Sequence, residues 1–305
     1  MSTTVPASDT AASGQPGAPD APRASHATPW LMTAPGVVLF LVMLVTPLVL
    51  TAVLAFGVFD HNLGTMVDGV TLSNFVAIVT DPYYYAILWR TFWIALVVTL
   101  LSVLIGVPEA YILSRMRNPW RSILLVVVLA PLLVSVVVRA FGWSILLGNG
   151  GLVNQGLQAL GFEEVKLLYT NTAIVIGLVH VMLPFMIIPV WTTLQKIDPS
   201  AADAALSLNA SFFTTLRRIV LPQMTPGILS GSLIVFGLSA SSFAIPGLLG
   251  GRRLKMVATL VYDEYLNTLN WPLGAALAIV LLLANLLIML SYNRLLEQRY
   301  RKRLG

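Results

Sequence analysis

The sequence predicts an all-α integral membrane protein with six transmembrane helices, and three observations lead to this fold class. Of its 305 residues, 57% are hydrophobic and only 10% are charged, whereas about 25% of the residues of a soluble domain are charged. Six apolar segments come close to the roughly 20 residues that a helix needs to cross a bilayer. Basic residues fall in short runs between these segments, as membrane orientation requires.

The predicted transmembrane domain covers residues 30–293. Its spans are Leu31–Gly57, Thr91–Val107, Ile123–Val138, Thr172–Leu194, Ile228–Leu249 and Pro272–Tyr292. Residues 1–29 are rich in Ala, Ser, Thr, Pro and Gly without apolar periodicity, which predicts a disordered tail. Residues 294–305 are predicted to form a second, basic tail after the last span.

The distribution of Lys and Arg predicts that both termini lie in the cytoplasm. The side of the termini carries Arg23, Arg115, Arg117, Arg121, Lys196, Arg217, Arg218, Arg294, Arg299, Arg301, Lys302 and Arg303. The opposite side carries Lys166, Arg252, Arg253 and Lys255. Because positive residues concentrate on the cytoplasmic side, both tails and the loop of residues 196–222 are predicted to be cytoplasmic. The cluster from Arg252 to Lys255 runs against this rule.

The sequence also argues against several function classes. The basic residues do not gather on one polar face, which argues against nucleic-acid binding despite a net charge of +5. The chain has no cysteine, so it has no disulfide, thiolate nucleophile or cysteine metal site. It has no Gly-Lys pair, so no phosphate-binding P-loop is expected. His180 has no ligand-type residue at metal spacing and no nucleophile motif. We therefore predict a non-enzymatic chain that binds no metal or cofactor.

The loop of residues 196–222 carries the most informative pattern. Alanines around Asp203 favour a short helix, and Asn209 can end that helix in the left-handed conformation. A helix of small residues lets another protein approach its backbone closely. From the residues alone, a docking surface for a partner and an ordinary connecting loop are both open interpretations.

This loop resembles the cytoplasmic EAA loop of permeases of ATP-binding-cassette (ABC) importers. The family pattern is Glu-Ala-Ala, three residues, Gly, nine residues, then Ile-x-Leu-Pro. The chain has the same spacing, with Asp203-Ala204-Ala205, Asn209 and Ile219-Val220-Leu221-Pro222. It departs from the pattern at Asp203 and Asn209. The resemblance implies that Asp203, Ala204, Ala205, Asn209, Leu221 and Pro222 couple the chain to an ATPase.

Further segments resemble the spermidine/putrescine branch of these permeases. They are Val138–Trp143, Leu146–Gly148, Gly150–Asn154, His180–Phe185, Pro226–Ile228, Phe243–Pro246, Leu249–Gly251 and Asn270–Gly274. The resemblance implies a type I importer permease in the bacterial inner membrane that moves a polyamine or similar small solute. Its implied partners are membrane lipid, an ABC ATPase dimer that holds ATP and Mg, a second permease or a second copy, and an extracytoplasmic substrate-binding protein. The alternative is a secondary transporter or channel not driven by ATP.

Candidate substrate-pathway residues are polar or ionisable groups at or near membrane depth, which are costly there and often functional. Arg139 is interpreted either as part of a structural pair or as a pathway residue. Ser239, Ser241 and Ser242 beside Phe243 either pack helices closely or line the pathway. Asp263 and Glu264 either attract a cationic substrate or form a solvated acidic loop. For His180 we expect a hydrogen bond that ties two helices together.

Overall fold

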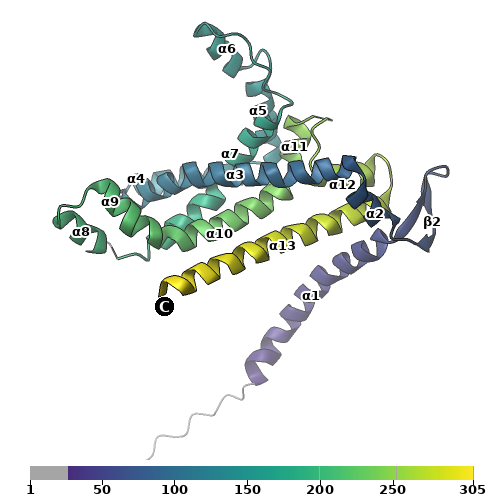
Figure 1. The fold of residues 1–305 in the computed structure, drawn as a ribbon, viewed down its shortest axis with the longest axis horizontal. Coiled ribbons are helices and arrows are strands. Elements are labelled where there is room, and N and C mark those ends of the chain that lie inside the picture. Colours follow the sequence, from purple (N-terminus) through teal and green to yellow (C-terminus); the bar gives the residue numbers. More distant parts are fainter. Residues whose placement is uncertain (1–26, 199, 252, 305) are drawn as a thin grey trace, which may run out of the picture. The chain divides into compact units, whose positions relative to one another are not determined.

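The computed structural model describes residues 27–198, 200–251 and 253–304, and they form a mainly helical protein (Figure 1). Its elements are α1 (Ala27–Ala55), β1 (Gly57–Asp60), β2 (Thr65–Val70), α2 (Ser73–Thr80), α3 (Pro82–Arg115), α4 (Trp120–Leu133), α5 (Val136–Leu147), α6 (Leu152–Ala159), α7 (Asn171–Leu194), α8 (Ser200–Ser207), α9 (Phe212–Thr215), the π-helix η1 (Leu216–Val220), α10 (Leu221–Ala240), α11 (Ala244–Leu249), α12 (Val257–Leu266) and α13 (Trp271–Leu304). Most of the predicted N-terminal tail, and Arg252 of the basic cluster, lie outside the described residues.

The chain divides into two compact units, Met1–Val49 and Leu50–Gly305. The first contains most of α1, an apolar helix that includes Pro35 and Pro47. The second contains the end of α1 and all later elements. Its strands β1 and β2 form an antiparallel hairpin with a register shift after Gly57.

The prediction of six spans is confirmed for the described residues. Six helical stretches are long and apolar enough to cross a membrane: Thr33–Ala55, Pro82–Arg115, Val136–Ala159, Asn171–Leu194, Phe212–Ala240 and Trp271–Tyr292. The predicted second span, Thr91–Val107, lies inside the longer α3. Helix α13 continues without a break through the segment predicted as a basic tail, as far as Leu304.

The predicted third span, Ile123–Val138, is wrong. Helix α4 ends at Leu133, the next residue, Val134, is extended, and α5 begins at Val136. Pro131 lies in the last turn of α4, and its nitrogen has no hydrogen to donate. The apolar run therefore covers the end of one helix and the start of the next. The stretch that is long and apolar enough to cross a membrane is Val136–Ala159, which consists of α5 and α6 joined by a turn at residues 148–151.

The predicted fifth span, Ile228–Leu249, is misplaced at both ends. The helical stretch begins at Phe212 and runs through η1 into α10. In η1 the N–H of Leu221 donates to the carbonyl of Leu216, one residue further back than in an α-helix. This wider turn leaves room for the ring of Pro222, which in an α-helix clashes with the carbonyl four residues back. At the other end α10 stops at Ala240, so Leu249 belongs to the separate helix α11.

The core is a bundle in which α3, α7 and α10 pack against one another. Buried apolar side chains such as Val98, Met186 and Val235 fill it. In a bilayer such packing is stabilised by van der Waals contact and close helix approach rather than by removal from water. Gly227 shows how close α10 comes to α7, because a Cβ there would lie 2.8 Å from the carbonyl oxygen of Pro189.

The second unit has two distinct ends, connected by the bundle. At one end, α8 and α9 lie beyond the last turns of α3 (Figure 1). At the other end, α12 packs against α13 and the first turns of α3. At 1.5 Å per residue, Arg90 and Tyr111 stand roughly 30 Å apart along α3, which is about the thickness of the hydrocarbon core of a bilayer.

Candidate functional site

The first candidate site is the α8 surface, which we define as α8 and the residues after it as far as Phe213. Ahead of the helix, the Asp198 carboxylate accepts a hydrogen bond from the Ser200 backbone N–H at 2.9 Å. Hydrogen bonds with Ser200 hold the pKa of Asp198 below its usual value. A negatively charged carboxylate interacts favourably with the partial positive charge at the N-terminal end of a helix. Asp198 therefore helps to fix where α8 begins.

The end of α8 confirms the left-handed conformation that the sequence predicts for Asn209. Its φ angle is +65°, in the left-handed region. The N–H of Ala210 donates to the carbonyl of Ala205 at 3.1 Å, across the left-handed residue. This is the bond pattern of a Schellman motif, in which Gly is the commonest left-handed residue and Asn is also found. The departure from glycine at this position therefore leaves the helix end intact.

The α8 surface exposes small and apolar side chains together. Leu208 is 85% exposed and Phe213 is 69% exposed, and Ala204 is also exposed. Ala205 is half-buried, while the side chain of Asp203 lies outside the described residues. Leu221 and Pro222, the other predicted coupling residues, are exposed at the start of α10. Exposed apolar groups of this kind typically mark a protein interaction surface.

An aromatic contact connects the α8 surface to the bundle. The rings of Phe212 and Tyr111 lie 6.3 Å apart, and the Arg115 guanidinium lies over the Tyr111 ring at 5.6 Å. Tyr111 and Arg115 belong to the last turns of α3, and α9 leads through η1 directly into α10. The α8 surface is therefore connected to two of the three bundle helices, α3 and α10.

Of the candidate pathway residues, Arg139 lies beside a polar contact between α5 and α7. The expected helix-tying hydrogen bond of His180 is confirmed, because Trp143 Nε1 donates to His180 Nδ1 at 3.1 Å. Arg139 is one turn before Trp143 on the same face of α5. Its Nε and Nη1 atoms are buried without a hydrogen-bond partner among the described residues.

The serine patch lies at the end of α10, where Ser239 belongs to the last turn of the helix and Ser241 and Ser242 follow it. Ser239 is buried, and its hydroxyl has no hydrogen-bond partner among the described residues. The hydroxyl of Ser241 donates to the Gly237 carbonyl at 2.9 Å, and the N–H of Ser242 donates to the Ser239 carbonyl. Two of the three serines thus satisfy the last backbone groups of α10 where the helix stops.

The second candidate site is the α12 hollow, a cavity of about 350 Å³. It is lined by Val137, Phe243, Ala244, Gly247, Leu248, Gly251, Lys255, Thr259, Tyr262 and Asp263. The rings of Phe243 and Tyr262 stack with centroids 5.7 Å apart and planes 15° apart. The structure therefore brings together two of the predicted pathway residues, Phe243 and Asp263, although they come from different elements.

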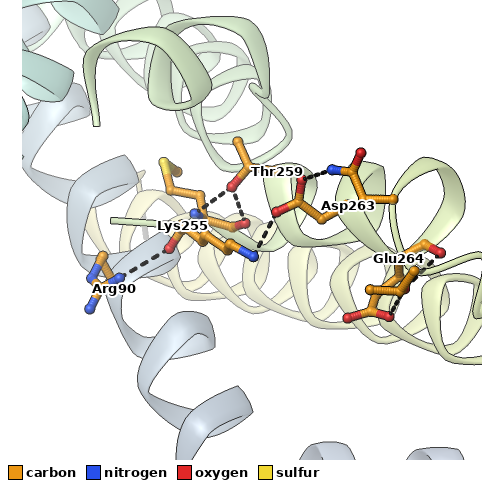
Figure 2. Close-up of polar contacts among 8 residues, drawn as sticks. Arg90, Lys255, Thr259, Asp263 and Glu264 are labelled. Atoms are coloured by element: carbon orange, nitrogen blue, oxygen red, sulfur yellow. Dashed lines mark hydrogen bonds and ion pairs between the residues drawn. The ribbon is translucent and has the colours of Figure 1, made fainter. Parts of the chain in front are cut away.

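Asp263 is already paired within the α12 hollow (Figure 2). Its Oδ2 atom lies 2.7 Å from Lys255 Nζ, and its Oδ1 atom accepts from Asn267 Nδ2 at 2.8 Å. Burial opposes the charge of Lys255, but the hydrogen bond to Asp263 and neighbouring acidic groups outweigh it and raise the pKa of Lys255. Glu264 instead accepts a hydrogen bond from Thr268 and does not line the hollow. The two predicted acidic residues thus have different surroundings.

Sequence reasoning missed the residues that hold this site in place. Arg90 Nη1 donates to the Lys255 carbonyl at 3.2 Å across 165 positions of sequence. Thr91 Oγ1 accepts from the Val257 N–H at 2.9 Å. No local signal in the sequence indicates either contact. Among the residues that the structure describes, no three His, Asp or Glu side chains gather closely enough to share a metal ion.

Comparison with known proteins places these features in context. Residues 99–302 match the family described as binding-protein-dependent transport system inner membrane component. The chain is 33% identical over 235 residues to the spermidine/putrescine transport system permease protein PotB of Haemophilus influenzae, covering 75% of this chain and 82% of that protein. It is 28% identical over 228 residues to the sulfate transport system permease protein CysT of Salmonella typhimurium, covering 74% and 81%.

The fold is also similar to that of a solved transporter. A chain in the crystal structure of a bacterial alginate ABC transporter, in complex with its pentasaccharide-bound periplasmic protein, superposes with a TM-score of 0.68. The match covers 87% of this chain and 92% of that chain at 20% sequence identity. At this level of identity the likeness concerns the fold.

Proposed function

We propose, because this chain belongs to the family of binding-protein-dependent transport system inner membrane components, that its α8 surface couples it to a separate ATPase and that its substrate is a polyamine. Family membership makes the chain a permease subunit of an ABC importer in the inner membrane, a non-catalytic component of the transporter. The proposal concerns which surface meets the ATPase, which solute crosses and how the chain is oriented.

The coupling proposal depends on one observation, the end of α8. Asn209 adopts the left-handed conformation and the bond from Ala210 to Ala205 closes the helix. The spacing of the EAA-like segment therefore yields a short exposed helix with a fixed end, although two of its residues depart from the pattern. Such a helix has a compact shape that can enter a groove on a partner. The small, half-buried side chain of Ala205 allows the partner to approach the helix backbone closely.

The path from the α8 surface into the bundle supports the same role. Phe212 contacts Tyr111 of α3, and α9 continues into α10. Closure of an ATPase dimer around bound ATP and Mg would therefore push on α3 and α10 together. A packed bundle responds to such a push as a rigid body, which allows the permease to alternate between inward-open and outward-open states.

The orientation and the remaining partners follow from this assignment. If the α8 surface meets a cytoplasmic ATPase, the α12 hollow at the other end of α3 faces outward, and both termini are cytoplasmic as the positive-inside rule predicts. The alginate transporter in the similar solved structure is bound to a periplasmic protein. We accordingly assign a substrate-binding protein to the outer face of this permease, beside a second permease subunit or a second copy of the chain.

The polyamine assignment is supported by sequence identity and by the chemistry of the α12 hollow. The matching Haemophilus protein is named a spermidine/putrescine permease, whereas the less similar Salmonella protein is named for sulfate. In the hollow, the carboxylate of Asp263 lies near the stacked rings of Phe243 and Tyr262. Carboxylates and aromatic faces both attract organic cations, and in this structure the Asp263 carboxylate already holds one ammonium group, that of Lys255.

Uptake of labelled putrescine by proteoliposomes that contain the complete importer tests both proposals. The wild-type complex should take up putrescine only with ATP. Ala205→Arg should reduce ATP-driven uptake to background without reducing insertion of the chain, because a long charged side chain prevents close approach of the ATPase. Ala205→Ser keeps the side chain small and is the matched control that should retain uptake. Normal uptake by Ala205→Arg would refute the coupling role, and ATP-driven uptake of sulfate instead of putrescine would refute the substrate.

A further inference from the structure

The Lys255 side chain lines the α12 hollow and forms an ion pair with Asp263 there. It is a four-carbon chain that ends in an ammonium group, and that group lies 2.7 Å from the Asp263 carboxylate. Both side chains are 27% exposed, so the pair is largely withdrawn from solvent at the edge of the cavity. A four-carbon chain with a terminal ammonium is also the chemical unit of a short linear diamine. The chain thus places its own alkylammonium where a diamine of the proposed substrate class would bind.

The main chain around Lys255 is anchored independently of this ion pair. Arg90 of α3 donates to the Lys255 carbonyl, and Thr91 accepts from the N–H of Val257. The N–H of Met256 donates to Thr259 Oγ1 at 2.8 Å (Figure 2). These bonds fix the segment to α3 and to the first turn of α12. The Lys255 side chain can therefore leave Asp263 while its backbone stays in place.

The rest of the hollow has the composition of an ammonium site. Asp263 is held in position by Asn267, which donates to its second carboxylate oxygen. The residues Phe243 and Tyr262, whose rings stack, are 51% and 48% exposed, and aromatic faces attract ammonium groups. The volume of about 350 Å³ lies within the range of small-ligand pockets. Space beside the ion pair is therefore available for the chain of a linear ligand.

We propose that the α12 hollow is a binding site for a primary alkylammonium group and that Lys255 is its tethered competitor. A diamine that enters from outside exchanges with Lys255 at Asp263, and Lys255 returns when the ligand moves on. This inference rests on the proposed polyamine transport and assigns the residues that meet the substrate. It explains why a lysine stands in the outer cluster that runs against the positive-inside rule, since its charge is neutralised by Asp263 until the substrate replaces it.

The proposal and a purely structural role for the ion pair predict opposite effects of one substitution. If Lys255 competes with the ligand, Lys255→Met frees Asp263 and strengthens diamine binding. If the pair is only a structural contact, the same substitution leaves binding unchanged or weakens it. Should the native pair be open for one-tenth of the time, the gain in affinity would be about tenfold.

The test measures binding of 1,4-diaminobutane to the full chain in lipid nanodiscs by calorimetry. Lys255→Met should bind about tenfold more tightly than the wild type, and Lys255→Met combined with Asp263→Asn should not bind. Arg253→Met removes the same charge from an exposed neighbour outside the hollow and should leave affinity unchanged. Butane-1,4-diol, which has the same chain without charge, should bind to none of them.

A second variant covers the case in which loss of Asp263 prevents folding. Tyr262→Leu leaves the ion pair intact and removes one aromatic wall, so it should weaken diamine binding several-fold in the Lys255→Met background. Equal or weaker binding by Lys255→Met than by the wild type overturns the proposal. If the complete importer takes up putrescine while these variants bind alike, the inference fails and the proposed function stands. If the predicted binding pattern appears without putrescine uptake, the substrate assignment fails and the alkylammonium site stands.

Discussion

The α8 surface and the α12 hollow lie at opposite ends of the bundle and are built in opposite ways. The α8 surface comes from one short stretch of sequence and leaves Leu208 and Phe213 uncovered. The α12 hollow takes Val137, Phe243 and Asp263 from separate elements and satisfies its charge internally with Lys255. A surface that a permanent partner covers can remain open and apolar. A site for a transient ligand must remain stable when it is empty, and an internal ion pair provides this.

Labelling of single cysteines gives the largest expected effect, because this comparison requires the two regions to lie on opposite sides of the membrane. The native chain has no cysteine and so gives no background. Leu208→Cys should react with a membrane-impermeant maleimide only in inside-out vesicles. Thr268→Cys, at the end of α12, should react only in right-side-out vesicles. The chain is expressed without its ATPase so that α8 remains uncovered, and equal labelling of both variants from one side would refute the orientation.

The substitution Asn209→Val tests whether ATP-driven uptake requires the conformation at the end of α8 as well as the exposure of the α8 surface. A β-branched residue at a φ of +65° is strained, and the left-handed conformation costs residues other than Gly, Asn and Asp about 1–2 kcal/mol. The correctly ended helix should then be about 5–30-fold less populated, and ATP-driven uptake should fall by a similar factor. Asn209→Gly is the control and should match the wild type. Full uptake by Asn209→Val would show that coupling to the ATPase does not depend on the conformation of the helix end.

The α8 surface could be predicted from the sequence because its determinants are local. Alanine propensity sets the helix, and Asn209 ends it through its own backbone conformation. The hydrogen bond of His180 was also predictable in kind, because a polar group inside a span needs a partner. That the partner would be Trp143 was not, since the two residues belong to different helices.

The errors in the spans have one physical cause. Hydropathy records how apolar a segment is and does not record whether its helix is continuous. Val134 is extended between α4 and α5, yet the surrounding segment remains apolar on both sides of the break. Pro222 disfavours a continuous α-helix, but the helical stretch continues through the π turn of η1 and past this residue. Both features depend on backbone geometry that composition does not reveal.

The α12 hollow could be predicted only in part, because its key contacts join distant residues. Phe243 and Asp263 were identified individually from their residue types. The pairing of Asp263 with Lys255 and the anchoring of Lys255 by Arg90 depend on how α12 packs against α3. A sequence that shows acidic and basic residues in one loop does not show which of them meet. The sequence therefore allowed us to identify candidate ligand-binding groups, but not Lys255 as the group that would compete with the ligand for Asp263.

The smallest expected effect concerns the stability of the empty hollow. A partly exposed ion pair contributes only about 0.2–1 kcal/mol, so Lys255→Met should lower the thermal unfolding midpoint slightly. Because the folded-state pKa of Lys255 is raised above its usual 10.5, this contribution is complete at lower pH and is lost as pH rises through that folded-state value. The difference in midpoint between wild type and Lys255→Met should thus persist through neutral and mildly basic pH and shrink only above 10.5. A difference that vanished near neutral pH would mean that Asp263 does not hold the lysine charged, and the contrast between an open surface and an internally satisfied site would no longer stand.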